Sequence, residues 1–467
     1  MFDVVQVRSG ARVVTDSSRD ARLTAFGKAT LSDRYLLPGE SYQDMFARVA
    51  SAYADDEAHA QRIYDYISNL WFMPATPVLS NGGTSRGLPI SCFLNEANDS
   101  LEGIVGLWNE NVWLAARGGG IGSYWGNLRS IGEKVGMNGK TSGVVPFIRV
   151  MDSLTLAISQ GSLRRGSAAC YLPVSHPEIE EFIEMRRPTG GDPNRKALNL
   201  HHGLLISDAF MRAVENDEEW ALTSPKDGAV LRKISARNLW IRILTARIET
   251  GEPYLVFVDH VNKARPEHHK LGNLEVKTSN LCSEITLPTG VDKYGKQRTA
   301  VCCLSSLNLE TYLEWHEHPT FIEDVMRFLD NVLEGFIQNA GSDFARATYA
   351  AMRERSVGLG VMGFHSFLQQ NNIPLESVMA KVWNKKMFKH IRGQCDEASQ
   401  KLAEDRGACP DAADYGIKER FSHKLAIAPT ASISIICGGA SPGIEPSAAN
   451  VYNRSEEHTS ELQSRLH

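Results

Sequence analysis

Short apolar segments alternate with amphipathic helices along most of this chain, and no other feature constrains the fold as strongly. Residues 254–258 and 425–428 are apolar runs of strand length. A helix is predicted from Thr320, with Glu323 as its capping-box partner. Its inward face is expected to carry Ile322, Val325, Met326, Leu329, Val332, Leu333 and Phe336. Buried strands that alternate with helices indicate an α/β fold, although periodicity alone leaves open whether the sheet is closed.

The chain is predicted to have three parts. Residues 1–75 form a helical segment, in which Ser41 and Asp44 resemble a capping box. One face of that helix would carry Tyr42, Met45, Phe46, Val49, Ala50 and Tyr53. Residues 76–453 form the main α/β region. Residues 454–467 are polar, lack any period and resemble the translation of a sequencing adapter, so we interpret them as a non-native, adapter-derived tail; the alternative is a natural solvated tail.

Composition restricts the class of protein. The chain has 467 residues, a formal net charge of −5 and 42% hydrophobic residues, as globular proteins do. This near-balanced charge favours neither nucleic acid nor a membrane surface as a partner. No apolar run is long enough to cross a bilayer, and the N-terminus lacks a signal peptide, so a cytoplasmic location is expected. The eight cysteines are then mostly thiols.

The segment 280–285 holds the most informative group of side chains. If it is an extended strand, Asn280, Cys282 and Glu284 project from one face, because side chains alternate along a strand. A thiol between an amide and a carboxylate can abstract an atom, hold a hydroxyl and move its proton. The simpler alternative is a buried cysteine with two incidental polar neighbours. That alternative would require separate partners for both polar groups.

The pattern Asn-x-Cys-x-Glu in this context is similar to the active-site finger loop of ribonucleotide reductase large subunits. The resemblance spans about residues 24–453, with further motifs in the same order. It implies that Cys282 forms a transient thiyl radical, which removes the 3′ hydrogen of the ribose. It also implies that Glu284 is the base on the 3′ hydroxyl and that Asn280 hydrogen-bonds the sugar.

Two further cysteines resemble the reducing pair of this family. Cys92 lies in Pro-Ile-Ser-Cys-Phe-Leu, and Cys302 fits the family pattern Cys-x-Leu-Ser-x-x-Asn-Leu. Loss of the ribose 2′ hydroxyl as water requires two electrons, which a dithiol supplies when it becomes a disulfide. Cys303 is expected to face the other way. The cysteines that match no motif are interpreted as structural, namely Cys170, Cys395, Cys409 and Cys437.

Substrate contacts are predicted in three places. Small hydroxyl residues and backbone N–H groups after a strand form a natural anion site, and residues 428–434 have this character. With the glycine and proline at 443–446, the segment resembles the substrate-diphosphate loop of the family. Its predicted contacts are Pro429, Thr430, Ala431, Ser432 and Ile433. Thr76, Ser91 and Gly120 match the other substrate contacts, and Gly120 belongs to a glycine loop beside the ribose.

Effector recognition is predicted from a second set of residues. Asp99, Leu101 and Arg129 match the family positions that hold a deoxynucleotide effector. Residues 159–167 correspond to the mobile loop that reports effector identity, with Arg165 as the expected reporter. An ordinary surface charge is the alternative for each arginine. One further basic residue of the effector site has no clear counterpart, and either Lys134 or Lys140 is a candidate substitute.

The resemblance also implies the fold and the partners. The expected fold is a ten-stranded α/β barrel with the finger loop inside it. The expected substrates are ribonucleotides, most simply diphosphates, and the effectors are deoxynucleotides or ATP. The chain would hold no cofactor itself. A metal-containing small subunit would supply the radical, thioredoxin or glutaredoxin would reduce the enzyme, and the large subunit would form a homodimer.

The sequence departs from the family at both ends. It leaves no room for an N-terminal ATP cone, so an on/off switch by ATP and dATP is not expected. It stops before the paired tyrosines of the radical path and the C-terminal cysteine pair. We therefore expect an incomplete barrel and a chain that binds nucleotides without turnover. Two alternatives stay open: an adenosylcobalamin-dependent class II reductase, and a non-catalytic nucleotide-binding protein.

Two histidine pairs suggest a metal site at first sight. They are His201 with His202 and His268 with His269. No cysteine or carboxylate lies at ligand spacing from either pair, so surface or supporting histidines are the favoured interpretation and no metal site is predicted.

Overall fold

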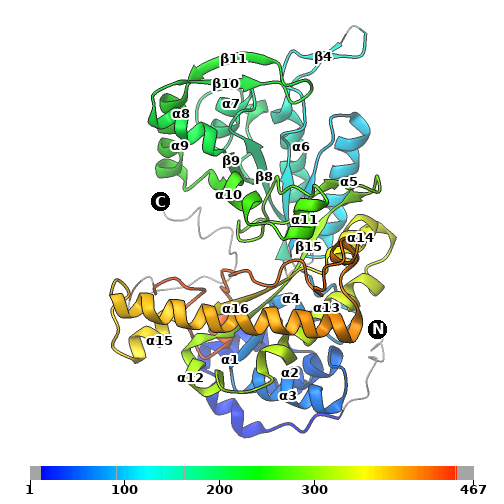
Figure 1. Cartoon of the computed structure of the whole chain (residues 1–467), viewed down its shortest axis with the longest axis vertical. Coiled ribbons are helices and arrows are strands. Elements are labelled where there is room, and N and C mark those ends of the chain that lie inside the picture. The colour runs from blue at the N-terminus through cyan, green and yellow to red at the C-terminus, as the bar shows by residue number, and fades with distance from the viewer. Residues whose placement is uncertain (1–11, 91, 138, 161–163, 448, 450–467) are drawn as a thin grey trace. The chain divides into compact units, whose positions relative to one another are not determined.

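The computed structural model describes residues 12–90, 92–137, 139–160, 164–447 and 449, and these form two compact units. Unit 1 comprises the described residues up to 90, residues 302–341 and the described residues from 348 onward. Unit 2 comprises residues 92–301, as far as they are described, and 342–347. Figure 1 shows the helices and strands of both units, coloured along the chain.

Unit 1 is mainly helical. Its elements are η1 (Ser17–Arg22), α1 (Ala25–Arg34), α2 (Tyr42–Ala52), α3 (Glu57–Ser68), β1 (Phe72–Pro74), α4 (Thr76–Asn81), β15 (Ala300–Asn308), η3 (Leu309–Thr311), α12 (Tyr312–Trp315), α13 (Phe321–Asn339), α14 (Ala345–Glu354), β16 (Val357–Met362), α15 (Phe364–Gln370), α16 (Val378–Arg406), α17 (Pro410–Ala413) and α18 (Ile433–Ile436). Two of these, β15 and α14, begin with residues that belong to unit 2.

Helix α13 forms the core of unit 1. All seven side chains predicted to face inward are buried, and α13 contacts α3, α16 and β16. The predicted capping box is wrong, because no side chain caps this helix. The Thr320 hydroxyl donates instead to Asp324, at 2.9 Å, and Glu323 accepts from Arg327. The capping box of α2 is confirmed, since Ser41 and Asp44 bond each other's backbone N–H groups.

Three strands pair in unit 1. Strand β15 is antiparallel to β1 and parallel to β16. The predicted strand at 425–428 is wrong in extent. Only Leu425 forms a ladder bridge, to Leu359 of β16, and the residues after it continue as irregular chain.

Unit 2 contains a parallel sheet whose strand order follows the sequence, β2-β3-β8-β9-β12. These strands are β2 (Cys92–Glu96), β3 (Gly120–Tyr124), β8 (Ser167–Pro173), β9 (His201–Ile206) and β12 (Tyr254–Phe257). Each connection passes through at least one helix, as parallel neighbours require. The α/β prediction is confirmed, and the predicted apolar run at 254–258 provides β12.

The connections of unit 2 hold its remaining elements. They are α5 (Leu101–Ala116), β4 (Lys134–Val135), β5 (Gly139–Lys140), α6 (Val144–Ala157), β6 (Ser159–Gln160), β7 (Arg164–Arg165), α7 (Ile179–Glu184), η2 (Pro193–Arg195), α8 (Asp208–Glu215), β10 (Glu219–Thr223), β11 (Val230–Ser235), α9 (Ala236–Thr250), α10 (Val258–Lys263), α11 (Glu267–Leu271), β13 (Gly290–Val291), β14 (Gln297–Arg298) and η4 (Ser342–Phe344). Figure 1 shows α8 and α9 together with the β10–β11 hairpin, and α9 contacts both α8 and β11.

One face of the parallel sheet supports the segment that follows α11. A cluster of buried side chains on this face consists of Tyr124, Ala169, Tyr171, Leu205 and Val256. Leu281 packs against that cluster. The segment with the predicted catalytic cysteine therefore lies against the sheet of its own unit.

Candidate active site

The finger loop is a tight turn that begins at Asn280. The Asn280 carbonyl accepts a hydrogen bond from the Ser283 N–H at 3.2 Å. Ser283 has a φ of 64°, in the left-handed region. The prediction that residues 280–285 form an extended strand is therefore wrong, because a turn reverses the chain after residue 280. The turn still brings Asn280 and Glu284 together.

The side chain of Asn280 connects the main polar groups. Its amide nitrogen donates to the Glu284 carboxylate at 2.7 Å and lies 3.5 Å from the Cys92 sulfur. Its amide oxygen accepts the Ile285 N–H at 3.1 Å. Asn280 is fully buried, whereas Cys282, two residues further on, is exposed. The structure thus places an amide, a carboxylate and the Cys92 thiol together, and Cys282 lies two residues after Asn280 in the turn.

Glu284 has the electrostatics of a proton acceptor. Burial raises the pKa of this carboxyl above its ordinary value, although the hydrogen bond from Asn280 opposes the shift. A raised pKa brings a carboxylate closer to the operating pH, which general base catalysis favours.

Cys92 and Gly120 lie opposite each other on neighbouring strands. Cys92 begins β2, Gly120 begins β3, and the two are partners in the parallel register. The Cys92 side chain is buried. A predicted reducing thiol and a predicted ribose contact are therefore adjacent in unit 2.

Two residues that position the finger loop were missed from the sequence. The Tyr171 hydroxyl of β8 donates to the Asn280 carbonyl at 2.6 Å. A Cβ on Gly122 of β3 would lie 1.7 Å from the Ser279 carbonyl oxygen. The sequence predicts a glycine loop beside the ribose, but no signal in the sequence links Tyr171 to the finger loop.

Two of the predicted effector residues, Asp99 and Arg129, contact each other in unit 2. The Arg129 guanidinium bonds the Asp99 carboxylate at 2.7 and 2.8 Å, and it donates to the Lys134 carbonyl at 2.6 Å. Lys134 pairs with Lys140 across the β4–β5 hairpin. Leu101 begins α5 and is 68% exposed. Both lysine candidates thus lie on the hairpin that Arg129 contacts.

In unit 1, Cys302 and Cys303 occupy opposite faces of β15. The Cys302 sulfur would lie 2.9 Å from a Cβ on Gly358 of β16, so the absence of that atom leaves room for the thiol. The Cys303 thiol contacts the Leu329 carbonyl of α13 at 3.8 Å. Burial raises the pKa of Cys303, and Asp330 adds to this shift. The four cysteines interpreted as structural are all buried free thiols.

The predicted phosphate segment also lies in unit 1. Thr430 has a φ of 54°, and its hydroxyl accepts the Gly443 N–H at 2.8 Å. This bond joins the two halves of the predicted loop. Residues 431 and 432 form a turn that leads into α18, and Pro429 precedes it in irregular chain. Thr76 begins α4 and bonds the Tyr35 hydroxyl at 3.0 Å, and α1, which ends beside Tyr35, contacts α18.

Two predicted residues cannot be placed in full. Ser91 lies outside the described residues. Arg165 is described only by its backbone, which pairs with Ser159 between β6 and β7. Their roles stay predictions, as does the pairing of Cys92 with Cys302.

Known proteins resemble this chain along most of its length. The family model "Ribonucleotide reductase, all-alpha domain" matches residues 21–87, and "Ribonucleotide reductase, barrel domain" matches residues 90–415 and 410–465. This chain belongs to the ribonucleotide reductase large-subunit family. The predicted α/β barrel preceded by a helical segment is thereby confirmed as its fold class.

Individual relatives of this reductase chain agree with the family models. The chain is 39% identical to "Ribonucleoside-diphosphate reductase large subunit" of Invertebrate iridescent virus 3, over 95% of this chain and 77% of that protein. It is 32% identical to "Vitamin B12-dependent ribonucleoside-diphosphate reductase" of Mycobacterium tuberculosis, over 93% of this chain and 64% of that protein. Among solved structures, the "Actinobacillus ureae class Id ribonucleotide reductase alpha subunit" is 31% identical. Its TM-score is 0.82, and the match covers 97% of this chain and 80% of that chain.

The histidine pair at the start of β9 takes the supporting position rather than the surface position, the two interpretations that the sequence left open. His201 and His202 are buried, and both bond the Glu252 carboxylate. Burial alone would raise the pKa of Glu252, but the hydrogen bonds from both histidines outweigh it and lower that pKa. His268 and His269 are buried as well. Within the described residues, no group of three or more metal-ligating side chains is found.

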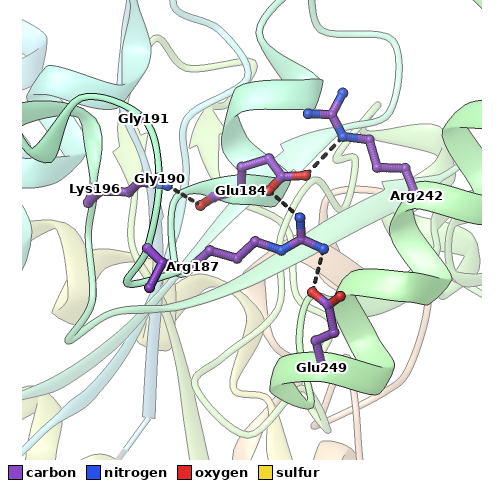
Figure 2. Close-up of a pocket in the computed structure, with 8 residues that line it drawn as sticks. Glu184, Arg187, Gly190, Gly191, Lys196, Arg242 and Glu249 are labelled. Atoms are coloured by element: carbon purple, nitrogen blue, oxygen red, sulfur yellow. Dashed lines mark hydrogen bonds and ion pairs between the residues drawn. The ribbon is translucent and has the colours of Figure 1, made fainter.

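A surface pocket of unit 2 is lined by charged residues that already pair. Figure 2 shows Arg187 between Glu184 and Glu249, at 2.7 and 2.5 Å. Arg242 bonds Glu184 at 2.9 Å, and Lys196 donates to the Glu184 carbonyl at 3.1 Å. Each of these cations already has a carboxylate or carbonyl partner, so the pocket is better explained as an ion-pair network than as an anion site. None of the described helices is both long and apolar enough to cross a membrane.

Proposed function

We propose that this chain is the catalytic subunit of a class I ribonucleotide reductase, which reduces ribonucleoside diphosphates by thiyl-radical chemistry. The observation that carries the proposal is the placement of Asn280, whose amide lies between the Glu284 carboxylate and the Cys92 sulfur, two residues from Cys282. The names of the relatives support the diphosphate, and the class Id neighbour supports the class.

Each of these residues has a separate role in the proposed reaction. The Cys282 thiyl takes the 3′ hydrogen of the ribose, and Glu284 accepts the proton of the 3′ hydroxyl, which Asn280 helps to orient. The 2′ hydroxyl is protonated and leaves as water. Cys92 and Cys302 together give two electrons and two protons and become a disulfide. The 3′ hydrogen returns from Cys282, so one ribonucleotide and two thiols give one deoxyribonucleotide, one water and one disulfide.

The chain depends on partners in this proposal. A separate metal-containing small subunit supplies the one-electron oxidation of Cys282. Thioredoxin or glutaredoxin returns the disulfide to two thiols. The substrate diphosphate binds the segment of Thr430 and Ser432, where hydroxyls and backbone N–H groups suit an anion. A deoxynucleotide effector binds beside Asp99 and Arg129, in a homodimer.

A class II enzyme is the alternative, because a vitamin B12-dependent relative matches nearly all of this chain. Both classes would use the same thiols, amide and carboxylate, so these residues do not separate them. The source of the radical does. Turnover with adenosylcobalamin and no small subunit would establish class II and overturn the class I assignment.

Binding is the first test, and it uses this chain as it stands. Isothermal titration calorimetry should show that CDP binds more tightly than CTP. It should also show that Cys282→Ser leaves CDP affinity within about twofold, because the thiol has a chemical role and the change is small. Equal affinity for CDP and CTP would contradict the diphosphate preference.

Turnover is the second test, in a longer version that carries the C-terminal tyrosines and cysteine pair. Cys282→Ser should abolish deoxyribonucleotide formation, and Glu284→Gln should reduce it by about 10²–10⁴-fold, the usual contribution of general acid–base catalysis. Cys302→Ser should block clean reduction, whereas the matched control Cys303→Ser should retain it. A tenth of normal activity in Cys282→Ser would overturn the thiyl-radical assignment.

A further inference from the structure

The segment between β3 and α6 carries the predicted effector residue Arg129, and both ends of this segment are held by the turn that follows β8. The His176 ring donates from Nε2 to the Leu128 carbonyl at 2.8 Å. The Glu178 carboxylate accepts the Ile131 N–H at 3.1 Å and the Val144 N–H at 2.9 Å. Two side chains that lie two residues apart therefore fix the start and the end of this segment.

His176 and Glu178 are also tied to each other. The Glu178 N–H donates to the His176 Nδ1 at 3.1 Å, so one ring nitrogen accepts while the other donates. This arrangement requires the neutral ring. Burial lowers the pKa of His176 to about 4, although the Leu128 carbonyl opposes the shift, so the neutral form prevails at neutral pH.

Glu178 occupies a site with little spare room. Its residue is 5% exposed. Gly143, directly before α6, has a φ of 90°, and a Cβ there would lie 2.3 Å from a Glu178 carboxylate oxygen. Only glycine fits this backbone conformation and this close approach without strain. Arg195 lies 3.4 Å from the carboxylate and also pairs with Glu181.

The held segment controls where Arg129 lies. We call His176 and Glu178 the clamp. Arg129 follows Leu128 directly and comes two residues before Ile131, so the clamp contacts the backbone on each side of Arg129. Arg129 in turn bonds Asp99 and the Lys134 carbonyl. Loss of the clamp would free the backbone on both sides of Arg129. The free-energy cost of ordering this backbone would then reduce the affinity for a ligand.

We propose that His176 and Glu178 are positioning residues that hold residues 128–135 in the shape that binds the deoxynucleotide effector. This inference rests on the proposed effector site at Asp99 and Arg129. The clamp residues bond Leu128, Ile131, Val144 and Arg195, none of which is a predicted substrate residue, so their removal affects the effector and leaves substrate affinity unchanged. That separation distinguishes a positioning role from a general contribution to folding.

Calorimetry on the whole chain tests the proposal with dATP, dGTP and dTTP as effector probes and CDP as the substrate probe. Glu178→Ala should weaken the binding of the best deoxynucleotide at least tenfold and change CDP affinity by less than twofold. Glu178→Gln keeps the shape and one acceptor oxygen, so it should recover most of the loss. Glu181→Gln is the matched control, because Glu181 also pairs with Arg195 but does not touch the segment.

Gly143→Ala provides a second route to the same result. Its Cβ would displace the Glu178 carboxylate, so it should also weaken the effector selectively if Glu178→Ala fails to fold. The proposal is overturned if Glu178→Ala or Gly143→Ala folds and binds the deoxynucleotide within twofold of the affinity of the unmutated chain. If the unmutated chain binds CDP but none of the three deoxynucleotides, the effector assignment itself fails, and the role of the clamp fails with it.

Discussion

The contact between Gly122 and the finger loop predicts the effect of adding one methyl group. In Gly122→Ala, the new Cβ would lie 1.7 Å from the Ser279 carbonyl oxygen and 2.9 Å from the Asn280 Cα. A carbon and a carbonyl oxygen normally approach no closer than about 3.3 Å. Both obstructing atoms belong to the backbone, so no side chain can rotate away. The loop must move by about 1.5 Å, from the difference between these distances.

The cost of this movement follows from the contacts that it breaks. Overpacking a close-packed site costs about 1–3 kcal/mol. Displacement of Asn280 also strains its hydrogen bond with Tyr171, which is 2.6 Å long and contributes about 1 kcal/mol. The free energy of unfolding of unit 2 should therefore fall by about 2–4 kcal/mol. In a turnover-competent version, a misplacement of about 1 Å should cost about 10²-fold in rate.

Denaturant unfolding and hydrogen exchange measure the two consequences separately. Exchange of residues 279–285 should accelerate in Gly122→Ala. The control is Gly106→Ala within α5, where the nearest atom is the Arg346 Nη2 at 3.5 Å. That change should stabilise the helix by up to about 1 kcal/mol. An unchanged midpoint and unchanged loop exchange in Gly122→Ala would refute the claim that β3 fixes the finger loop.

Three further changes test other contacts. Tyr171→Phe should lower the free energy of unfolding by about 1 kcal/mol and weaken CDP binding measured by calorimetry; unchanged values would show that its bond to Asn280 is dispensable. Asp330→Ala should cost about 3–5 kcal/mol in denaturant unfolding, because it removes the buried carboxylate that Arg355, Arg406 and Arg420 share. The pKa of His176 is lowered to about 4, so its stabilising contribution is present above about pH 6.5 and is lost as the pH falls. Relative to His176→Asn, the chain should lose about 2 kcal/mol between pH 7 and pH 5, and a pH-independent difference would contradict this.

Local patterns predicted the parts of the fold that local physics determines. The buried face of α13 and the capping box of α2 follow from helical spacing and from two polar residues three apart. Strand β12 follows from an apolar run. The motif around Asn280 and Glu284 correctly indicated that two polar side chains belong together, because they bond each other in the structure.

Two features of unit 2 do not follow from local sequence patterns. The turn at Ser283 requires a left-handed φ, which serine rarely adopts and which no residue type there indicates. For His201 and His202 the sequence left open a surface or a supporting position, because no carboxylate lies at ligand spacing from them. Glu252, fifty-one residues after His201, supplies it once β12 pairs with β9.

The finger loop therefore depends on the sheet as much as on its own motif. Tyr171 holds the Asn280 carbonyl from β8, and Gly122 of β3 lets the backbone approach. Leu281 packs against the apolar cluster of the sheet while Cys282 beside it remains exposed. An Asn-x-Cys-x-Glu segment removed from this sheet would lose each of these restraints and would have no reason to keep its turn. The chemistry that we propose for Cys282 thus needs Tyr171, which lies 109 positions before Asn280, and a search for the motif alone would not find it.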